Sequence, residues 1–384
     1  MKTNFQEIVR FINNIYVGEQ PILHRPVFAG NEKQYLCECI DSSFVSSIGA
    51  RVTEFEQLVA AYTGAKYAVV TVNGTAALHI ALLMAGVTPG SEVITQALSF
   101  IATCNAVHYA GATPVFVDVD RDTLGMSAVA LRQFLELHAF KKDGVTFNKV
   151  SGKRFAACLP MHTFGHPCRI DEIVAICAEF GIPVVEDAAE SLGSYYQGQH
   201  TGTFGLLGTF SFNGNKIITT GGGGMIVTNN LEIAVKAKHI TTTAKIPHPY
   251  EFVHDEVGFN YRLPNLNAAL GCAQMEQLDK FVQIKRDLAL KYATYFDAQE
   301  ISFIREPTGA VSNYWLNALV LADVVERNAF LEHTNANGVM TRPIWRLMTK
   351  LTMFDQCQHD GLENSHWLEE RIVNIPSGVP MSML

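Results

Sequence analysis

The spacing of hydrophobic and polar residues differs between parts of the chain. From residue 65 onward, short apolar runs typical of buried strands alternate with longer runs whose apolar residues recur at helical spacing. The predicted strands cover residues 67–72, 92–95, 114–119, 155–160, 183–187 and 209–212, and the predicted helices cover residues 75–85, 100–109, 128–138 and 170–180. Helices at this interval between buried strands favour an α/β fold with a mainly parallel sheet covered on both faces.

The two ends of the chain follow other patterns. Residues 5–15 and 52–62 are predicted to be amphipathic helices, and the polar stretch between them is interpreted as a connection. Near the C-terminus, the pattern predicts a long helical region at 265–296 interrupted at Gly271, strands at 315–321 and 339–342, and helices at 325–335 and 363–372. We therefore expect a large domain at 1–250, which includes the N-terminal helical segment, and a smaller C-terminal α/β domain at 251–384.

Composition narrows the classes of function. The 384 residues are 48% hydrophobic and 17% charged with a net charge of −8, so the chain lacks the basic stripe that a nucleic-acid partner requires. The eight cysteines show no CxxC pair and no metal-binding spacing, which indicates reduced thiols and no metal. The N-terminus resembles neither a signal nor a transit peptide, and the longest nearly apolar run, 76–87, is too short for a bilayer. We expect a cytoplasmic protein with no membrane partner.

The candidate chemistry centres on residues 208–224, GTFSFNGNKIITTGGGG. Lys216 lies there among small and polar residues, as a lysine that forms a Schiff base with an aldehyde cofactor would. Ser211 ends a predicted strand, so its hydroxyl could reach an anion beside the lysine. The alternative is a solvated loop lysine next to a flexible glycine tract. A phosphate-binding P-loop is excluded, because Gly214 is followed by Asn215 and Lys216 by Ile217.

Four positions together favour one cofactor. Thr75 opens a predicted helix, whose free N–H groups and dipole suit a phosphate, and Asp187 ends a predicted strand, where ligands bind in parallel sheets. With Ser211 and Lys216, they supply what pyridoxal 5′-phosphate requires: an anion site, a carboxylate for the pyridine nitrogen and an amine for the aldehyde.

Longer motifs carry a family resemblance over essentially the whole chain. They are VNGTAALHIAL at 72–82, PVVEDAAESLGS at 183–194, SFNGNKIITTGGGGMIVT at 211–228 and GFNYRLPNLNAALG at 258–271. In order and spacing they resemble the fold type I aminotransferases, and among these the DegT/DnrJ-type sugar-nucleotide aminotransferases that use pyridoxal phosphate. Each motif alone is weak, but the set is highly specific.

The resemblance implies roles for individual residues. Lys216 would hold the cofactor, Thr75 and Ala76 would contact its phosphate through backbone and hydroxyl groups, and Ser211 would add its own hydroxyl. Asp187 would pair with the pyridine nitrogen and keep it protonated. The resemblance also implies that glutamate is the amino donor and a nucleotide sugar the acceptor.

Four further residues match the family pattern, and three of them have an alternative interpretation. Phe100 matches the aromatic residue that stacks on the cofactor, or it is a core aromatic of a helix. Glu190 stands where many relatives have glutamine or histidine near the cofactor's phenolic oxygen, or it faces the surface. His162 matches a histidine that lines the pocket, or it is a structural histidine. Asn260 matches a residue that reaches the phosphate in the neighbouring subunit, which implies a homodimer with shared active sites.

Three other motifs look like the LegC-type branch, which aminates C4 of a UDP-linked 4-keto-6-deoxy-N-acetylhexosamine for legionaminic-acid-type or related surface sugars. They are PMHTFGHPCRID at 160–171, TTTAKIPHPYEFVHDE at 241–256 and GVMTRPIWRLM at 338–348. Arg342, Trp345 and Arg346 are then candidates for substrate contact, because arginine suits a diphosphate, or they belong to a packed surface of the small domain.

Other functions stay open as alternatives. GDP-perosamine-type synthases share nearly all the core motifs, and a non-catalytic regulatory protein of the same fold would be expected to lack part of the Asp187, Ser211 and Lys216 set. A sugar dehydratase of this fold has histidine at the position of Lys216, and a nicotinamide dehydrogenase would need the glycine fingerprint that this chain lacks.

Overall fold

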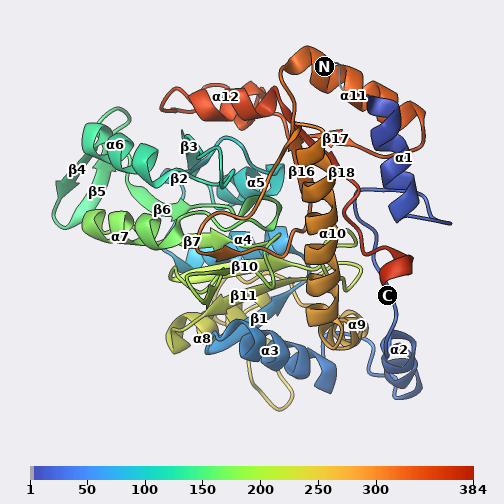
Figure 1. The fold of residues 1–384 in the computed structure, drawn as a ribbon. Helices are drawn as coiled ribbons and strands as arrows, with labels where there is room; N and C mark the ends of the chain where they lie inside the picture. Colours follow the sequence, from blue (N-terminus) through green and yellow to red (C-terminus); the bar gives the residue numbers. More distant parts are fainter. Residues whose placement is uncertain (1–3) are drawn as a thin grey trace.

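A computed structural model describes residues 4–384 and contains a large central sheet (Figure 1). Its strands are β1 (Tyr67–Thr71), β2 (Glu92–Gln96), β3 (Thr113–Val117), β6 (Phe155–Leu159), β7 (Val185–Asp187), β10 (Leu207–Ser211) and β11 (Gly224–Thr228). They run in the order β1-β11-β10-β7-β6-β2-β3, with β6 and β7 joined by parallel bridges. Only β11 is antiparallel to its neighbours, so the predicted mainly parallel sheet is confirmed.

Helices cover both faces of this sheet. One layer contains α4 (Gly74–Met84), α5 (Ile101–Tyr109) and α8 (Leu231–Thr241); the other contains α3 (Ala50–Thr63), α6 (Ala128–His138), α7 (Ile170–Phe180) and α9 (Asn265–Met275). Consecutive strand residues point to opposite layers: Val69 packs with α4 and α8, and Val70 packs with α3 and α9. Because both faces are buried, most strands contain runs of apolar residues, and the sequence pattern therefore revealed them.

A second, antiparallel sheet lies beyond the long helix α10 (Leu278–Ala298), which crosses the front of the molecule in Figure 1. Its strands are β14 (Ser302–Phe303), β16 (Asn317–Val320), β18 (Ile372–Ile375) and β17 (Arg342–Pro343), in that order. The helices α1 (Phe5–Ile15) and α11 (Val324–Ala336) pack with α10 around Tyr292, Phe296 and Phe330. The N-terminal helix thus packs beside the second sheet. The domain boundary near residue 250 stays a prediction.

The predicted break at Gly271 is wrong. Gly271 lies inside α9 and is buried, and a Cβ atom there would stand 2.7 Å from the ring of Phe55 on α3. This glycine therefore allows two helices to approach closely, and the helical region breaks instead at Glu276 and Gln277, between α9 and α10.

Two other helix assignments differ from the sequence pattern. The polar stretch interpreted as a connection contains α2 (Glu32–Asp41), whose buried residues are only Glu32 and Cys39, so it has almost no apolar stripe. The last predicted helix is shorter than expected: α12 (Glu363–Glu369) ends before Ile372, which begins β18.

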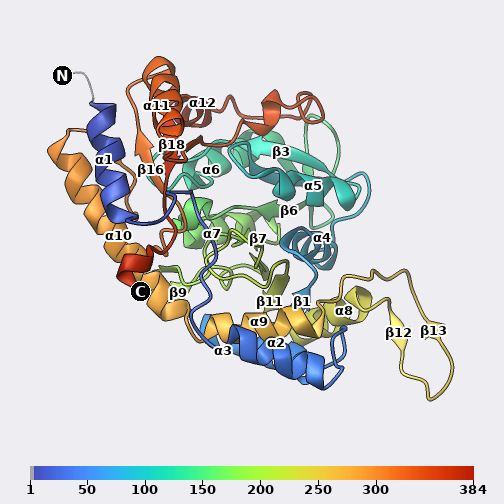
Figure 2. The same ribbon diagram turned by 90° about the vertical axis from the view of Figure 1, so that its right-hand side faces the viewer.

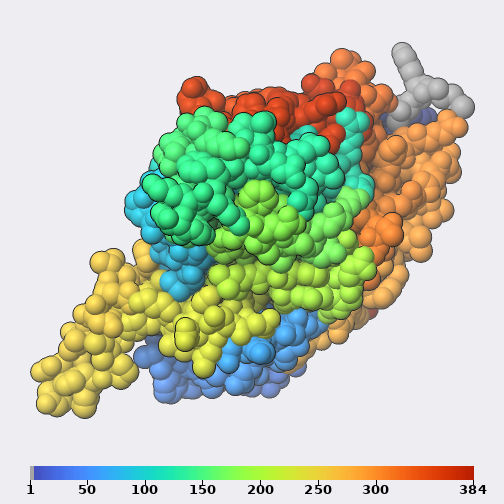
Figure 3. All heavy atoms as spheres, turned by 90° about the vertical axis from the view of Figure 1, so that its left-hand side faces the viewer, coloured from blue at the N-terminus to red at the C-terminus, as the bar shows by residue number. Residues whose placement is uncertain are grey.

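A hairpin arm projects from the large sheet's side of the molecule (Figures 2 and 3). It consists of β12 (Lys245–Ile246) and β13 (Val253–His254), and the side chains of Tyr250 and Phe252 at its tip are each 82% exposed. The remaining short elements are β4 (Ala139–Lys142), β5 (Val145–Asn148), β8 (Tyr195–Tyr196), β9 (Gln199–His200), β15 (Ala310–Val311), η1 (Thr163–Gly165), η2 (Met348–Lys350) and η3 (Met381–Met383). Within residues 4–384, no helix is both long and apolar enough to cross a membrane.

Candidate active site

A cavity of about 630 Å³ opens where β7 and β10 end and where α4 begins. Most of the residues singled out in the sequence line it: Thr75, Phe100, Asp187, Glu190, Ser211, Lys216, Arg342, Trp345 and Arg346. The exceptions are Ala76, His162 and Asn260. Segments that are distant in sequence therefore meet at the carboxyl edge of the large sheet, which is where ligands bind in such folds.

Lys216 is held in this cavity and is not a solvated loop residue. Its side chain is only 12% exposed, and its Nζ atom lies 3.2 Å from Oε1 of Glu190. The same atom lies 4.0 Å from the ring centre of Trp315, a cation–π contact that orients the amine. The amine thus has a defined position in the cavity, between a carboxylate and an aromatic ring.

Asp187 lies at the end of β7 and has only neutral donors. Its Oδ2 accepts a hydrogen bond from the Thr103 hydroxyl at 2.7 Å, and its Oδ1 accepts one from the Ala189 N–H at 3.2 Å. Burial raises the pKa of Asp187, while these hydrogen bonds and the more distant charges of Lys216 and His162 lower it. None of the ion pairs among residues 4–384 includes Asp187, so a cationic ring nitrogen in the cavity fits it as a partner.

The first turn of α4 forms the opposite end of the cavity. Oδ1 of Asn73 caps the helix by accepting the Ala76 N–H at 2.8 Å, so the Ala76 amide is already bonded. Gly74 lets Ser211 pack directly on this turn, because a Cβ atom at residue 74 would lie 2.8 Å from Cβ of Ser211. The Ser211 hydroxyl, Thr75 and the positive end of the helix thus converge, and this set fits a phosphate group.

Glu190 is buried beside the lysine. Its Oε2 accepts the Phe164 N–H at 2.9 Å, and its Oε1 faces Nζ of Lys216. Burial raises the pKa of Glu190 to about 7, although the nearby lysine lowers it. The carboxyl group can therefore take up or release a proton near neutral pH, and the alternative of a surface glutamate is excluded.

Phe100 and three residues of β17 and the loop after it, Arg342, Trp345 and Arg346, form the outer wall. Phe100 is 46% exposed, and its ring centre lies 6.1 Å from that of Trp345, so it is not a core aromatic. Arg342 and Arg346 are both exposed at the cavity. One guanidinium nitrogen of Arg342, Nη1, donates to Oδ1 of Asn335 at 2.9 Å, which leaves its other donors for a ligand.

The residues fit the cofactor that the sequence predicted, and comparison with known proteins gives the family. Residues 27–383 match the model of the DegT/DnrJ/EryC1/StrS aminotransferase family. The chain belongs to this family. Its members are aminotransferases that depend on pyridoxal 5′-phosphate, and this chain is therefore a pyridoxal phosphate-dependent transaminase.

Similar proteins agree with this assignment over nearly the full length. The GDP-perosamine synthase of Escherichia coli O157:H7 is 36% identical over 357 residues, which is 92% of this chain and 92% of that protein. The GDP-perosamine synthase of Vibrio cholerae is 32% identical over 92% of this chain and 93% of its own. The aminotransferase TlmJ from Streptoalloteichus hindustanus superposes with a TM-score of 0.83 at 26% identity and covers 92% of both chains. The predicted fold type I is confirmed.

Besides Ala76, two residues predicted for the site of this aminotransferase do not line the cavity. His162 is fully buried, with its Nε2 3.0 Å from Oε2 of Glu186 and its Nδ1 accepting the Cys168 N–H at 3.3 Å. His162 therefore does not line the cavity of its own subunit, and its position fits the alternative of a structural histidine, because a buried carboxylate holds its ring. Asn260 is exposed, and its Oδ1 accepts from Arg262 at 3.3 Å, so it takes no part in the site of its own subunit.

Sequence reasoning missed the residues that support the predicted ones. Trp315 was predicted only as the start of a strand, yet its indole N–H donates to the Asn215 carbonyl at 2.7 Å beside Lys216. The Asn313 side chain donates to the carbonyl oxygens of Glu190 and Leu192, both at 2.9 Å. A tryptophan among asparagines before an apolar run was the only signal in the sequence.

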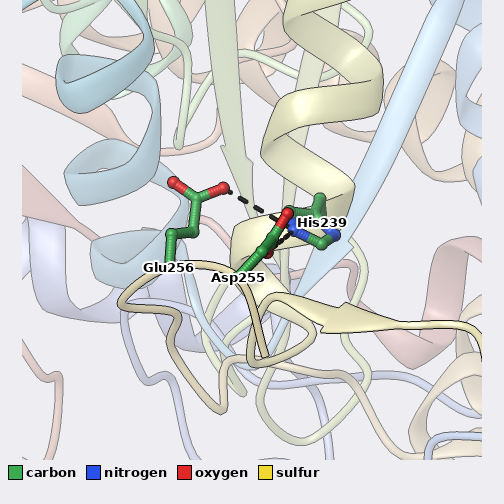
Figure 4. A group of neighbouring side chains, drawn as sticks. All are labelled: His239, Asp255 and Glu256. Atoms are coloured by element: carbon green, nitrogen blue, oxygen red, sulfur yellow. Dashed lines mark hydrogen bonds and ion pairs between the residues drawn. The ribbon is translucent and has the colours of Figure 1, made fainter. Parts of the chain in front are cut away.

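A separate titratable cluster lies near the base of the hairpin arm (Figure 4). Nε2 of His239 lies 2.7 Å from Oδ1 of Asp255 and 3.6 Å from Oε1 of Glu256. Among the described residues this is the one group of three with a geometry that could hold a metal ion. Lys236 also pairs with Glu256, so a protein cation already balances part of the charge, and none of these residues lines the active-site cavity.

Proposed function

We propose that this transaminase transfers the amino group of glutamate to C4 of a nucleotide-linked 4-keto-6-deoxy sugar, and we favour a UDP-linked 4-keto-6-deoxy-N-acetylhexosamine. The product would enter the synthesis of a surface polysaccharide such as O-antigen or of a legionaminic-acid-type sugar, in the cytoplasm. The observation that carries this proposal is one cavity with Lys216 at its base and Arg342 and Arg346 at its outer wall. An amine-transfer centre and two cations for a diphosphate thus share one space.

The cofactor would be held by residues from both ends of the cavity. The first turn of α4, Thr75 and Ser211 would hold its phosphate, Asp187 would pair with its ring nitrogen, and Phe100 would cover a ring face. When bound, pyridoxal phosphate supplies an electron sink and carries the nitrogen between the two substrates. The negative charge of Asp187 would keep the ring nitrogen protonated and thereby strengthen this sink.

The ε-amine of Lys216 would move the proton in each half of the reaction. It is placed for this by Glu190 at 3.2 Å and by the Trp315 ring at 4.0 Å. Because Glu190 is buried with a pKa of about 7, it can accept a proton from the amine and return it at neutral pH. The proton then moves only between two neighbouring side chains, and little water has to reorganise around the changing charges.

The outer wall would select the sugar nucleotide. Arg342 and Arg346 offer planar guanidinium donors for two phosphates, and Trp345 offers a ring face for the sugar or the base. Because both arginines are exposed at the cavity, the diphosphate would sit at its mouth and the C4 ketone would point towards Lys216. We infer that the arginines contribute mainly to substrate binding and little to the proton transfer.

A second copy of the chain would complete each site. Asn260 and the arm are exposed on the subunit's surface, and Tyr250 and Phe252 carry apolar rings into solvent there. In a homodimer, Asn260 would reach the phosphate bound at the partner's α4, as the family pattern implies. This arrangement makes the active sites shared.

The experiment is to incubate the enzyme with glutamate and a panel of UDP- and GDP-linked 4-keto-6-deoxy sugars and to detect aminated products by mass. We expect the UDP-linked N-acetylhexosamine to give the highest kcat/KM. Preference for the GDP-linked sugar would favour a GDP-perosamine-type synthase, the second candidate, which the two relatives at 36% and 32% identity support. If no nucleotide sugar is aminated while glutamate is consumed, the proposed acceptor class is wrong.

A further inference from the structure

Among residues 4–384, one lysine is buried without a carboxylate partner. Lys285 lies on α10 with a fully buried side chain, and its Nζ donates to the carbonyl oxygens of Trp315, at 3.1 Å, and Ser377. None of the ion pairs among residues 4–384 includes it. Lysine is among the residues least often buried, because its amine loses hydration, so a buried lysine calls for a specific role.

The two carbonyl groups belong to chain segments that Lys285 ties together. Ser377 follows β18; its N–H donates to the Leu23 carbonyl at 2.8 Å, and its Oγ accepts the Asn317 N–H at 2.8 Å. Trp315 precedes β16. One amine on α10 thus fixes the start of one central strand of the second sheet against the end of its neighbour.

Trp315 leads from this junction into the active site. Its backbone N–H donates to Oδ1 of Asn313 at 2.8 Å, while its carbonyl accepts from Lys285, so its backbone is fixed on both sides. Its indole N–H donates to the Asn215 carbonyl at 2.7 Å, and its ring centre lies 4.0 Å from Nζ of Lys216. The path from Lys285 to Lys216 therefore passes through one rigid aromatic residue.

We propose that Lys285 is a positioning residue that clamps the carbonyls of Trp315 and Ser377 together and thereby holds the Trp315 ring against the ε-amine of Lys216. The proposal rests on the proposed role of Lys216. Without the clamp, two buried carbonyl groups lose their donor and the segment at 313–316 shifts to find others. The ring then no longer directs the amine, and the proton-transfer step slows while substrate binding is kept.

The clamp tolerates a change in the charge of Lys285. Burial lowers the pKa of Lys285 from 10.5 to about 7. A neutral amine still has two N–H donors, one for each carbonyl, so the contact persists on both sides of neutral pH. The role is therefore geometric.

The test compares Lys285→Met, which removes the donors at similar volume, with Lys285→Gln, which keeps two donors on a shorter chain, in the holoenzyme. Lys280→Met, the same change at an exposed position of α10, is the matched control. Two readouts are needed. The first is kcat together with KM. The second is acrylamide quenching of Trp315 fluorescence in a Trp345→Phe, Trp367→Phe background, in which Trp315 alone remains of the three tryptophans.

We expect Lys285→Met to lower kcat about ten-fold or more with KM changed less than about two-fold, and to raise the quenching of Trp315. Lys285→Gln should lose part of each, and Lys280→Met should match the parent protein. Unchanged kcat and quenching, or a change in one without the other, would overturn the proposal. If Lys285→Met does not fold, Lys285→Gln is judged by the same two readouts.

A prior measurement separates this proposal from the proposed function. Borohydride reduction of the parent holoenzyme, followed by peptide mass analysis, shows whether the cofactor is attached at Lys216. Absence of attachment there would refute the proposed function itself. Attachment at Lys216 with no response to Lys285→Met would refute the positioning role alone.

Discussion

Burial of Glu190 in the site changes the pH at which its carboxyl group binds a proton. Its pKa is raised from 4.5 to about 7 in the folded protein, so between these values the folded state binds more protons than the unfolded state. The contribution of Glu190 to stability is therefore fully present below pH 4.5 and is lost as the pH rises through 7. A glutamine at this position has no such dependence.

We expect Glu190→Gln to gain stability relative to the wild-type protein between pH 4.5 and pH 7, by about 3 kcal/mol at most from the size of the pKa change. The measurement is urea unfolding of both cofactor-free proteins at several pH values. A stability difference that is constant over this range, or that shrinks as the pH rises, would show that Glu190 is not held in this way.

Some of the site residues can be predicted from the sequence and others cannot. Lys216, Asp187 and Ser211 lie in short contiguous motifs, at strand ends and in a glycine-rich loop. Their residue types and spacing along the chain are therefore sufficient to predict them. Trp315 and Thr103 reach the site from segments far along the chain, and only the folded structure brings them to Lys216 and Asp187. Such partners leave no spacing signal.

The sequence could not decide between the two interpretations of His162 for a related reason. Its segment matched the family pattern, but the direction of its ring is set by Glu186 on β7, which binds Nε2 at 3.0 Å. Glu186 also accepts the N–H groups of Gly202, Phe204 and Gly205, each at 2.7 Å. The pairing of a buried carboxylate is decided by tertiary structure, which the alternation of apolar residues does not encode.

At the scale of single elements, the packing of α4 on β10 determines the anion site. Gly74→Ala would place a Cβ atom 2.8 Å from Cβ of Ser211, so the first turn of α4 must move away from the strand. We expect the Kd for pyridoxal phosphate to rise about ten-fold, which corresponds to the loss of about one hydrogen bond. Equilibrium titration followed by cofactor absorbance measures it.

A matched glycine provides the control. Gly214 lies in the lysine-bearing loop, and a Cβ atom there would have no neighbour within 4 Å. Gly214→Ala should therefore leave cofactor affinity within about two-fold of the wild type, because no contact of the phosphate site changes. Equal effects of the two substitutions would mean that the close approach of α4 and Ser211 does not form the anion site.

Elements were predicted well where both faces of the large sheet are buried and poorly where packing is polar. The boundaries of α6 and α7 agree with the apolar pattern residue for residue. The helix α2 was missed because it buries Glu32 and Cys39 and has no apolar stripe. The strand β11 begins at the last of four consecutive glycines, and the sequence pattern therefore assigned this region to a loop.

At the scale of the whole molecule, the proposed sharing of sites between two subunits can be tested by complementation. Lys216→Ala and Asn260→Ala should each be nearly inactive as homodimers, for different reasons. A mixed dimer has one site with both defects and one site with neither. Random re-pairing of equal amounts should therefore restore about one quarter of wild-type activity.

The two inactive variants are unfolded and refolded together, and each is also refolded alone. No recovery in the mixture, with mixed dimers present by native mass, would show that Asn260 does not act in the partner's site. Full activity of Asn260→Ala alone would lead to the same conclusion.

The proposed function depends on the covalent attachment of the cofactor to Lys216. Reduction of the wild-type holoenzyme with borohydride, proteolysis and peptide mass analysis tests it most directly. We predict that the reduced cofactor is found on the peptide that contains Lys216, and that Lys216→Ala shows neither the label nor steady-state amination. Label on another lysine, or turnover by Lys216→Ala, would contradict the account.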